Sequence, residues 1–138
     1  MVEINIEYLG DLRCEIKHVP SGSSFKTDAP ADNQGLAEFI SPTDMIAGSF
    51  GACYLTTIGI AARTLNIDIR NSKVKVFKEM APDTPRRIGR LIVEIYFPDH
   101  LNPTDVSKFE KVIRTCPVAH SINPNIELIT KFFVAEKE

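Results

Sequence analysis

One stretch of the chain, residues 41–65, constrains the fold more than any other. It reads SPTDMIAGSFGACYLTTIGIAARTL and carries no charged side chain from Met45 to Ala62. Ser41 can cap a helix by accepting from an amide two or three residues on, and Pro42 suits the first helical position. The pattern predicts a single helix, on the order of 35 Å long at 1.5 Å per residue. Because it is apolar on every side, we expect it to be buried.

The first half of this predicted helix consists largely of small residues. Gly48 and Gly51 each cost about 1 kcal/mol relative to alanine inside a helix. Cys53 lies two residues after the second glycine, in the middle of the helix. We therefore expect that another backbone approaches closely around Cys53, and that this contact offsets the cost of the glycines.

Alternating apolar and polar residues predict strands on both sides of the long helix. A first hairpin is predicted at 2–8 and 12–18 with its turn at Gly10-Asp11, and a short third strand at 25–30; residues 36–40 could extend this sheet. After the helix the pattern predicts a second hairpin at 72–79 and 88–97, a helix from 103 to about 115, and a final strand at 126–134.

This order of elements predicts an α+β fold in which antiparallel sheets surround a long buried central helix. At 138 residues the chain is expected to form a single domain, residues 1–138. About six short strands can cover only one side of the helix, and a chain of this length has a limited core. We therefore expect a homodimer, with the long helices buried between two sheets.

Composition and charge narrow the possible partners and the compartment. The net charge of −2 gives no reason to expect binding to nucleic acid or to an anionic membrane. The uncharged part of 41–65 is long enough to test as a membrane span, but its glycines, serine and threonines favour a buried helix. Three cysteines, an odd number, without a recognisable secretory signal suit the reducing cytoplasm.

The cysteines are the first candidates for chemistry. Cys53 is either a small apolar packing residue or a reactive thiol. It lies about three turns into its helix, too far for the helix dipole to lower its pKa, so a nearby cation would be needed. Cys116 ends a helix before Pro117, and only the tertiary fold could bring it to Cys53. Cys14 lies on the inward face of a strand and reads as a core residue.

Histidine and arginine offer weaker signals. His120 follows Cys116 by four residues, so Cys53, Cys116 and His120 could form a three-ligand zinc site; a capping or surface histidine is the alternative. The arginines around the 81–87 proline loop suggest a solvated hairpin tip. Arg13 lies on the outward face of its strand, where it would face solvent in a monomer or the partner in a dimer.

Four segments together resemble one protein family: SPTDMIAGSFGACYLTTIGI (41–60), RTCPVAHSI (114–122), YLGDLR (8–13) and PRRIGRLIVEIYFP (85–98). In these segments the chain resembles the OsmC/Ohr family, the osmotically inducible and organic hydroperoxide resistance proteins. The resemblance covers nearly the whole chain in order. It implies an OsmC-like fold, an intertwined homodimer in which sheets from both chains wrap two long central helices.

The resemblance also implies an activity, the cysteine-dependent reduction of organic hydroperoxides, with hydrogen peroxide as a further substrate to consider. Cys53 matches the peroxidatic cysteine and Cys116 the resolving one. The first thiolate becomes a sulfenic acid, and the second cysteine condenses with it to a disulfide. A dithiol reductant, either a lipoyl protein, thioredoxin or a small thiol, then reduces the disulfide. The resemblance implies neither a metal nor an organic cofactor.

Family members also use an arginine from the N-terminal hairpin, supported by a glutamate near the start of the long helix. Arg13 is the best match for this arginine, whose charge would stabilise the thiolate and the reacting peroxide. The position of the glutamate, ten residues before Cys53, holds Thr43, and the adjacent Asp44 could substitute for it. This departure leaves open a second function, that of a non-catalytic redox sensor or small-ligand-binding protein.

Overall fold

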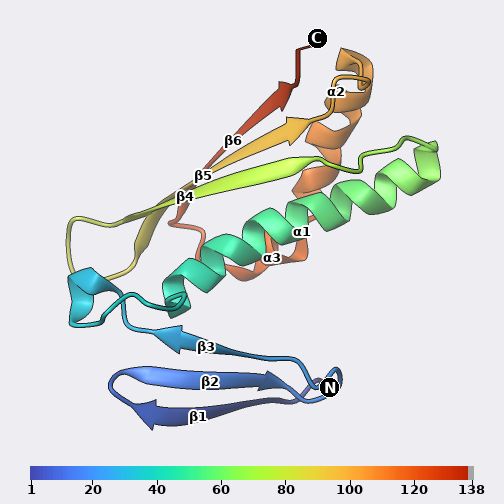
Figure 1. Ribbon diagram of the computed structural model, residues 1–138. Helices are drawn as coiled ribbons and strands as arrows, with labels where there is room; N and C mark the ends of the chain where they lie inside the picture. Colours follow the sequence, from blue (N-terminus) through green and yellow to red (C-terminus); the bar gives the residue numbers. More distant parts are fainter. Residues whose placement is uncertain (137–138) are drawn as a thin grey trace. The chain divides into compact units, whose positions relative to one another are not determined.

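The N-terminal strands form the sheet that their alternating pattern predicts. In the computed structural model, which describes residues 1–136, β1 (Ile4–Gly10), β2 (Arg13–His18) and β3 (Ser24–Asp28) pair antiparallel in the order β1-β2-β3 (Figure 1). They belong to the first of two compact units, Met1–Ile46; the second begins at Ala47. The expectation of a single domain stays a prediction.

The turn of the first hairpin lies one residue later than predicted. Asp11 and Leu12, not Gly10 and Asp11, form the two-residue loop, with φ of 53° and 61°. A two-residue turn of this kind needs positive φ at both central positions, which matches the twist of the strands. The register of the hairpin shifts between Tyr8 and Gly10, just before this turn, and Gly10 itself has a φ of 88°. The predicted shared face is confirmed, since Ile6 pairs with Ile16 and Tyr8 with Cys14.

The segment before the long helix extends this sheet by one bridge only. Thr27 bridges Ile40 in parallel, and the amide of Asp28 donates to the carbonyl of Ile40 at 3.2 Å. The rest of the segment is irregular and includes a 3₁₀ turn at Ala31–Asn33. The backbone pairing between this segment and β3 is thus limited to the bridge at Ile40.

The long helix is confirmed as α1 (Pro42–Leu65), and its ends follow the predicted signals. The Ser41 hydroxyl accepts from the Asp44 amide at 3.1 Å, and the Asp44 carboxylate accepts from the Ser41 amide at 3.3 Å. This reciprocal pair is a capping box in which aspartate takes the usual place of glutamate. Asn66 ends the helix in the left-handed conformation, with φ 54°.

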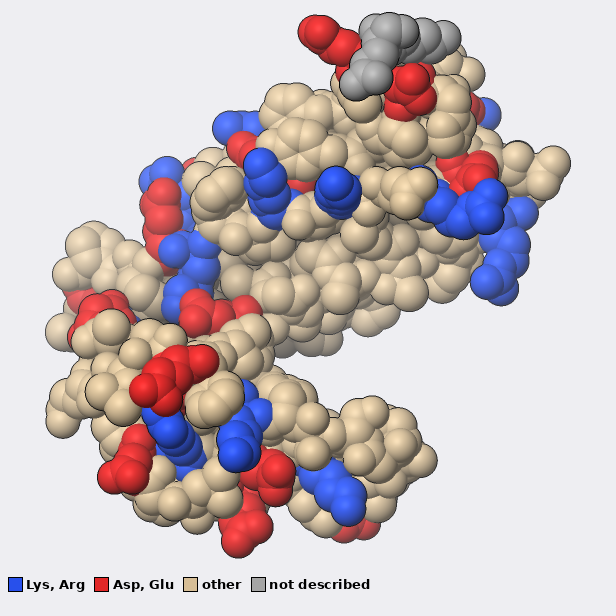
Figure 2. All heavy atoms as spheres, viewed as in Figure 1, with Lys and Arg blue, Asp and Glu red and all other residues tan. Residues whose placement is uncertain are grey.

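Only one face of α1 is buried within the described chain. That face carries Ala47, Phe50, Gly51, Tyr54, Ile58 and Ala62. The opposite face exposes Ile60 at 69%, and an uncharged strip of surface follows the helix in Figure 2. By length and composition α1 alone among helices of residues 1–136 could cross a membrane, but the core helix of a soluble protein passes the same test. Burial on all sides stays a prediction that requires a partner.

The glycines of α1 differ in what they contact. A Cβ added to Gly51 would lie 3.0 Å from Val74 and 3.1 Å from Val76, both side chains of the second unit's sheet. Gly48 has nothing within 4 Å of such an atom. Side chains of a strand therefore approach the helix at Gly51.

The sheet of the second unit contains a parallel pair of strands, so the all-antiparallel expectation is wrong there. Strand β4 (Lys73–Met80) pairs antiparallel with β5 (Ile88–Phe97), as predicted, but β6 (Glu127–Val134) runs parallel to β5. A parallel partner needs a crossover connection instead of a hairpin. Here the crossover is α2 (Pro103–Val112), a 3₁₀ turn (Ile113–Thr115) and α3 (Pro117–Ser121).

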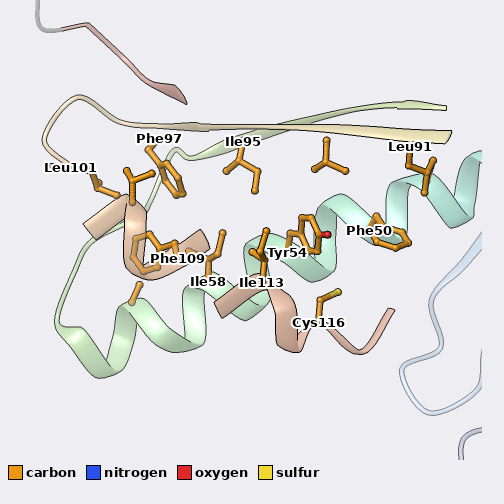
Figure 3. Close-up of a cluster of buried hydrophobic side chains, with 14 of the residues drawn as sticks. Phe50, Tyr54, Ile58, Leu91, Ile95, Phe97, Leu101, Phe109, Ile113 and Cys116 are labelled. Atoms are coloured by element: carbon orange, nitrogen blue, oxygen red, sulfur yellow. The ribbon is translucent and has the colours of Figure 1, made fainter. Parts of the chain in front are cut away.

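Helices α1 and α2 pack on one face of this sheet, and the core of the unit lies between the two layers (Figures 1 and 3). The predicted inward face of β5 is confirmed, since Leu91, Val93, Ile95 and Phe97 are all buried. Phe109 of α2 packs against Phe97 with ring centroids 5.6 Å apart. Cys116 belongs to the same core cluster.

Candidate functional site

The fold of the second unit brings Cys53 and Cys116 together. Cys53 lies in the middle of α1, and Cys116 lies at the bend between the 3₁₀ turn and α3. The Cys116 thiol is within hydrogen-bond reach of the Cys53 sulfur and donates to it. Cys53 is half-buried, whereas Cys116 is fully buried and is among the core side chains drawn in Figure 3. The more accessible sulfur is thus backed by a buried thiol.

The Cys-Pro sequence explains why backbone amides point at both sulfurs. Pro117 occupies the first position of α3, where no amide donor is required. The next two amides, of Val118 and Ala119, lack partners inside a helix that starts there. No side chain caps them; the Val118 amide donates to the Cys53 sulfur, and both amides donate to Cys116. The sulfurs thus take the place of a capping oxygen.

Thr57 provides a further contact from the helix of Cys53 itself. Its hydroxyl lies 3.9 Å from the Cys53 sulfur, one helical turn further along. Residues four apart on a helix share a face, so the threonine is held beside the sulfur by the backbone of α1. Its hydroxyl can donate to the sulfur when the thiol is ionised.

These contacts shift the pKa values of the two thiols in opposite directions. Burial alone raises the pKa of Cys53, but hydrogen bonds from Cys116, the Val118 amide and Thr57 lower its pKa below the ordinary value. For Cys116, burial and its hydrogen bond to Cys53 raise the pKa. When one of the two thiols loses its proton, the negative charge therefore forms on Cys53, and Cys116 keeps its proton. On ionisation such a pair offers a thiolate nucleophile with a protonated thiol next to it.

Tyr54 places a neutral hydroxyl in the same region. The side chain is 4% exposed, and its hydroxyl forms a hydrogen bond with Thr130 of β6. Burial raises the pKa of Tyr54, and the neighbouring sulfurs of Cys116 and Cys53 raise it further. The hydroxyl therefore stays protonated and ties α1 to β6 beside the cysteines.

Arg13 lies in the N-terminal unit between two carboxylates. It forms ion pairs with Glu38 and, at 3.5 Å, with Asp28, and its guanidinium lies 5.3 Å from the ring centroid of Phe39. The hydrogen bond to Glu38 raises the pKa of Arg13 above its ordinary value. Arg13 is therefore a fixed cation held by the loop that precedes α1.

Thr43 and Asp44, predicted as supporting residues, lie in the first turn of α1. Asp44 completes the capping box, and the Thr43 hydroxyl lies 3.3 Å from that of Ser41. The support that Asp44 gives to Arg13 stays a prediction. The loop residue Glu38 and the strand residue Asp28 are carboxylate partners of Arg13 that we did not predict.

The zinc interpretation finds no support in the described residues. The His120 ring nitrogen Nε2 forms a hydrogen bond with the carbonyl oxygen of Arg114 at 2.7 Å. Within residues 1–136, no three His, Cys, Asp or Glu side chains are grouped so that they could hold a metal ion. His120 thus fits the alternative, a histidine bonded to nearby backbone.

The remaining candidates have structural roles. Arg87 pairs with Asp83, and Arg90 with Glu127, in exposed positions that fit the solvated hairpin tip. Cys14 is half-buried in β2, opposite Tyr8 and Thr27, an arrangement typical of a packing residue.

Several residues of the site were missed by sequence reasoning, although some carried a signal. Thr57 could have been found, because a residue four after Cys53 shares its helix face. The Val118 and Ala119 amides follow from a proline at the start of a helix without a capping side chain. Asp28 carried a signal because it lies in a predicted strand, where aspartate is uncommon. Glu38 gave no signal.

A fold with a half-buried cysteine on a long central helix and a second cysteine at a Cys-Pro bend defines a thiol protein with a preformed cysteine pair. The chain belongs to the OsmC-like protein family, whose sequence model matches residues 35–131. The search of curated proteins found no match.

Solved structures agree with this assignment. A protein of Psychrobacter arcticus 273-4, provisionally described as an osmotic stress induced and detoxification response protein, is 42% identical, with a TM-score of 0.90 and 96% of each chain covered. The organic hydroperoxide resistance protein OsmC of Legionella pneumophila has a TM-score of 0.75 at 14% identity, covering 98% of this chain and 96% of that one.

A third structure comes from Vibrio cholerae O1 biovar eltor str. N16961. It is provisionally described as an organic hydroperoxide resistance protein and has captopril bound in one of its active sites. Its TM-score is 0.77 at 13% identity, with 96% of this chain and 90% of that chain covered. At these low identities the Legionella and Vibrio proteins support the OsmC-like fold alone.

Proposed function

We propose that this protein is a thiol-dependent peroxidase that reduces organic hydroperoxides through Cys53 and Cys116. The observation that carries the proposal is the hydrogen-bonded cysteine pair, in which the pKa of the accessible sulfur is lowered and that of the buried one is raised. Membership of the OsmC-like family supports it, and the same fold occurs in organic hydroperoxide resistance proteins.

The proposed reaction has three balanced steps. The Cys53 thiolate attacks the outer oxygen of ROOH, the O–O bond breaks, and Cys53 becomes a sulfenic acid while RO⁻ takes up a proton and leaves as ROH. The Cys116 thiol then attacks the sulfenic sulfur, forming the disulfide and releasing water. An external dithiol reduces the disulfide by thiol–disulfide exchange and is itself oxidised.

The contacts of the site suit these steps. The Val118 amide and the Thr57 hydroxyl hold the Cys53 thiolate before it attacks. Because Cys116 already contacts Cys53, its thiol needs little movement to reach a sulfenic acid there. Arg13 is proposed to supply the cation that stabilises the thiolate and the developing charge on the peroxide.

Peptide mapping after oxidation tests the proposal. One equivalent of cumene hydroperoxide is expected to convert the reduced protein to a form with an intramolecular Cys53–Cys116 disulfide and a free Cys14. Mass spectrometry of a digest alkylated under denaturing conditions measures all three thiols. If Cys53 and Cys116 are both alkylated after oxidant has been consumed, Cys116 is not the resolving residue. If no oxidant is consumed, the alternative of a non-catalytic binding protein is favoured.

We further propose that the protein acts as a homodimer. The row Ile4, Ile6 and Tyr8 on β1 is 53–65% exposed in the described chain, and α1 leaves an apolar face uncovered. Each of these exposed apolar surfaces is of the kind that marks an interface. Sedimentation velocity is expected to give about twice the chain mass of 15.4 kDa; a monomer at micromolar concentration would refute this proposal.

The reducing cytoplasm is the proposed compartment, because the cycle requires a dithiol to regenerate free thiols. Lipoyl proteins, thioredoxin and small dithiols are the reductants to compare. We propose no nucleic-acid or membrane partner.

A further inference from the structure

Asp28 is a buried carboxylate outside the cysteine site. It ends β3, and its side chain is fully buried. A buried carboxylate is costly unless a cation or several hydrogen bonds compensate it. The cation that Asp28 contacts is Arg13.

One oxygen of Asp28 makes two contacts. Its Oδ2 accepts from Arg13 Nη2 at 3.5 Å and from the backbone amide of Glu38 at 3.2 Å. A single carboxylate oxygen of Asp28 therefore binds both a side chain of β2 and the backbone of the loop before α1. The loop residue held in this way, Glu38, is the one whose carboxylate forms the other ion pair of Arg13.

The two carboxylates around Arg13 lie in different environments. The Glu38 side chain is 56% exposed, whereas that of Asp28 is 0% exposed. Solvent and salt screen an exposed pair strongly and a buried pair much less. Asp28 should therefore restrain Arg13 more than the longer distance alone suggests.

Only one nitrogen of the guanidinium takes part in the two ion pairs. Both ion pairs use Nη2 of Arg13, and its Nε is buried without a hydrogen-bond partner. The Oδ1 atom of Asp28 also has no partner. Arginine carries five N–H donors in a rigid plane, so holding one end fixes the direction of the others.

We propose that Asp28 is a positioning residue for Arg13, which it orients both directly and by fixing the backbone of Glu38. The proposal rests on the proposed function, in which Arg13 stabilises the reacting thiolate and peroxide. Asp28 acts only through Arg13 and touches neither the substrate nor the sulfurs in this role.

A double-mutant cycle on Asp28 and Arg13 tests the proposal. Asp28→Asn keeps the shape and an oxygen acceptor for the Glu38 amide but removes the charge that orients Arg13. The rate constant for oxidation of Cys53 by cumene hydroperoxide, followed in single-turnover stopped flow, is expected to fall about tenfold, a coupling typical of groups in contact. Reduction of the disulfide by a dithiol is expected to keep its rate.

The informative comparison is made in the Arg13→Ala background. There Asp28→Asn is expected to cause no further loss, because the residue through which it acts is gone. Glu15→Gln is the matched control: it removes a carboxylate from the same strand as Arg13 but from neither of its ion pairs, and should leave the rate unchanged. Melting temperatures confirm that each variant is folded; if Asp28→Asn is not, Asp28→Ser replaces it in the cycle.

Two results would overturn the proposal: an unchanged oxidation rate in Asp28→Asn, or an equal loss of rate with and without Arg13. Failure of the proposed function has a different signature. In that case wild-type Cys53 does not react with the hydroperoxide, and the Glu15→Gln control is equally inactive.

Discussion

Replacing Cys53 with serine is expected to abolish hydroperoxide consumption. Serine has nearly the same shape, but its hydroxyl is not ionised near neutral pH and cannot form a sulfenic acid. The amide of Val118 and the hydroxyl of Thr57 would then surround an oxygen that performs no chemistry. The measurement is steady-state consumption of t-butyl or cumene hydroperoxide with a dithiol reductant. Full activity in Cys53→Ser would refute the mechanism.

The matched control is Cys116→Ser, which removes the second sulfur only. This variant is expected to consume about one equivalent of hydroperoxide and then stop or slow, because the sulfenic acid on Cys53 has no neighbouring thiol. Loss of steady-state turnover in both variants, with a single turnover in Cys116→Ser alone, distinguishes the two roles. Equal single-turnover activity in both variants would contradict the assignment.

The pH dependence of alkylation checks the same assignment without a peroxide. The reactive species is the thiolate, and contacts lower the pKa of Cys53 whereas burial and its donor role raise that of Cys116. As pH rises, Cys53 should therefore reach half of its maximal alkylation rate before Cys116. Replacing Thr57 with valine should move the Cys53 profile toward higher pH.

The second large effect is expected from Phe109→Ala, a change that leaves the sulfurs untouched. Phe109 is fully buried between α2 and the sheet, where its ring packs against Phe97. Removing a buried aromatic ring costs about 3–5 kcal/mol, including the cavity that remains. This is a large part of a typical stability of about 5–15 kcal/mol. The melting temperature should fall by on the order of 10 °C.

Phe77→Ala provides the control for this substitution. Phe77 lies on β4 of the same unit and is 48% exposed, so the same truncation should change the free energy of unfolding by about 1 kcal/mol or less. Because α2 leads directly into the turn that carries Cys116, Phe109→Ala should also slow disulfide formation. A stability loss no larger than that of Phe77→Ala would show that α2 is not an essential part of this core.

Much of the fold follows from local pattern. The capping signals at Ser41 and the left-handed stop at Asn66 correctly predicted the two ends of α1. The alternation of apolar and polar residues identified the buried face of β5. The direction of β6 could not be predicted, because residues 126–134 alternate identically whichever way the strand runs. Its parallel pairing is decided by where the α2–α3 connection ends, which is a property of the whole second unit.

Several residues of the candidate site could be predicted from local sequence, but the contacts between them could not. Cys53 and Cys116 stand out by their local sequence, one among small helical residues and the other before a proline. Their contact is tertiary, and so are the pairs that Arg13 forms with Asp28 and Glu38. The resemblance pointed to Asp44 and Thr43, in the first turn of α1, as the support of Arg13. The ion pairs of Arg13 are with Glu38 in the preceding loop and with Asp28 in β3.

The separation of the two cysteines along the chain links stability to redox potential. A Cys53–Cys116 bond would close a loop of 63 residues, counted from one position to the other. In the chain-entropy account, a crosslink of this span destabilises the unfolded chain by about 4 kcal/mol. Folding and disulfide formation form a thermodynamic cycle, so the reduction potential of the bond is lower in the folded protein than in the unfolded chain by about 90 mV. The proposed reductant must therefore be a strongly reducing dithiol, and the oxidised protein should be the more heat-resistant form.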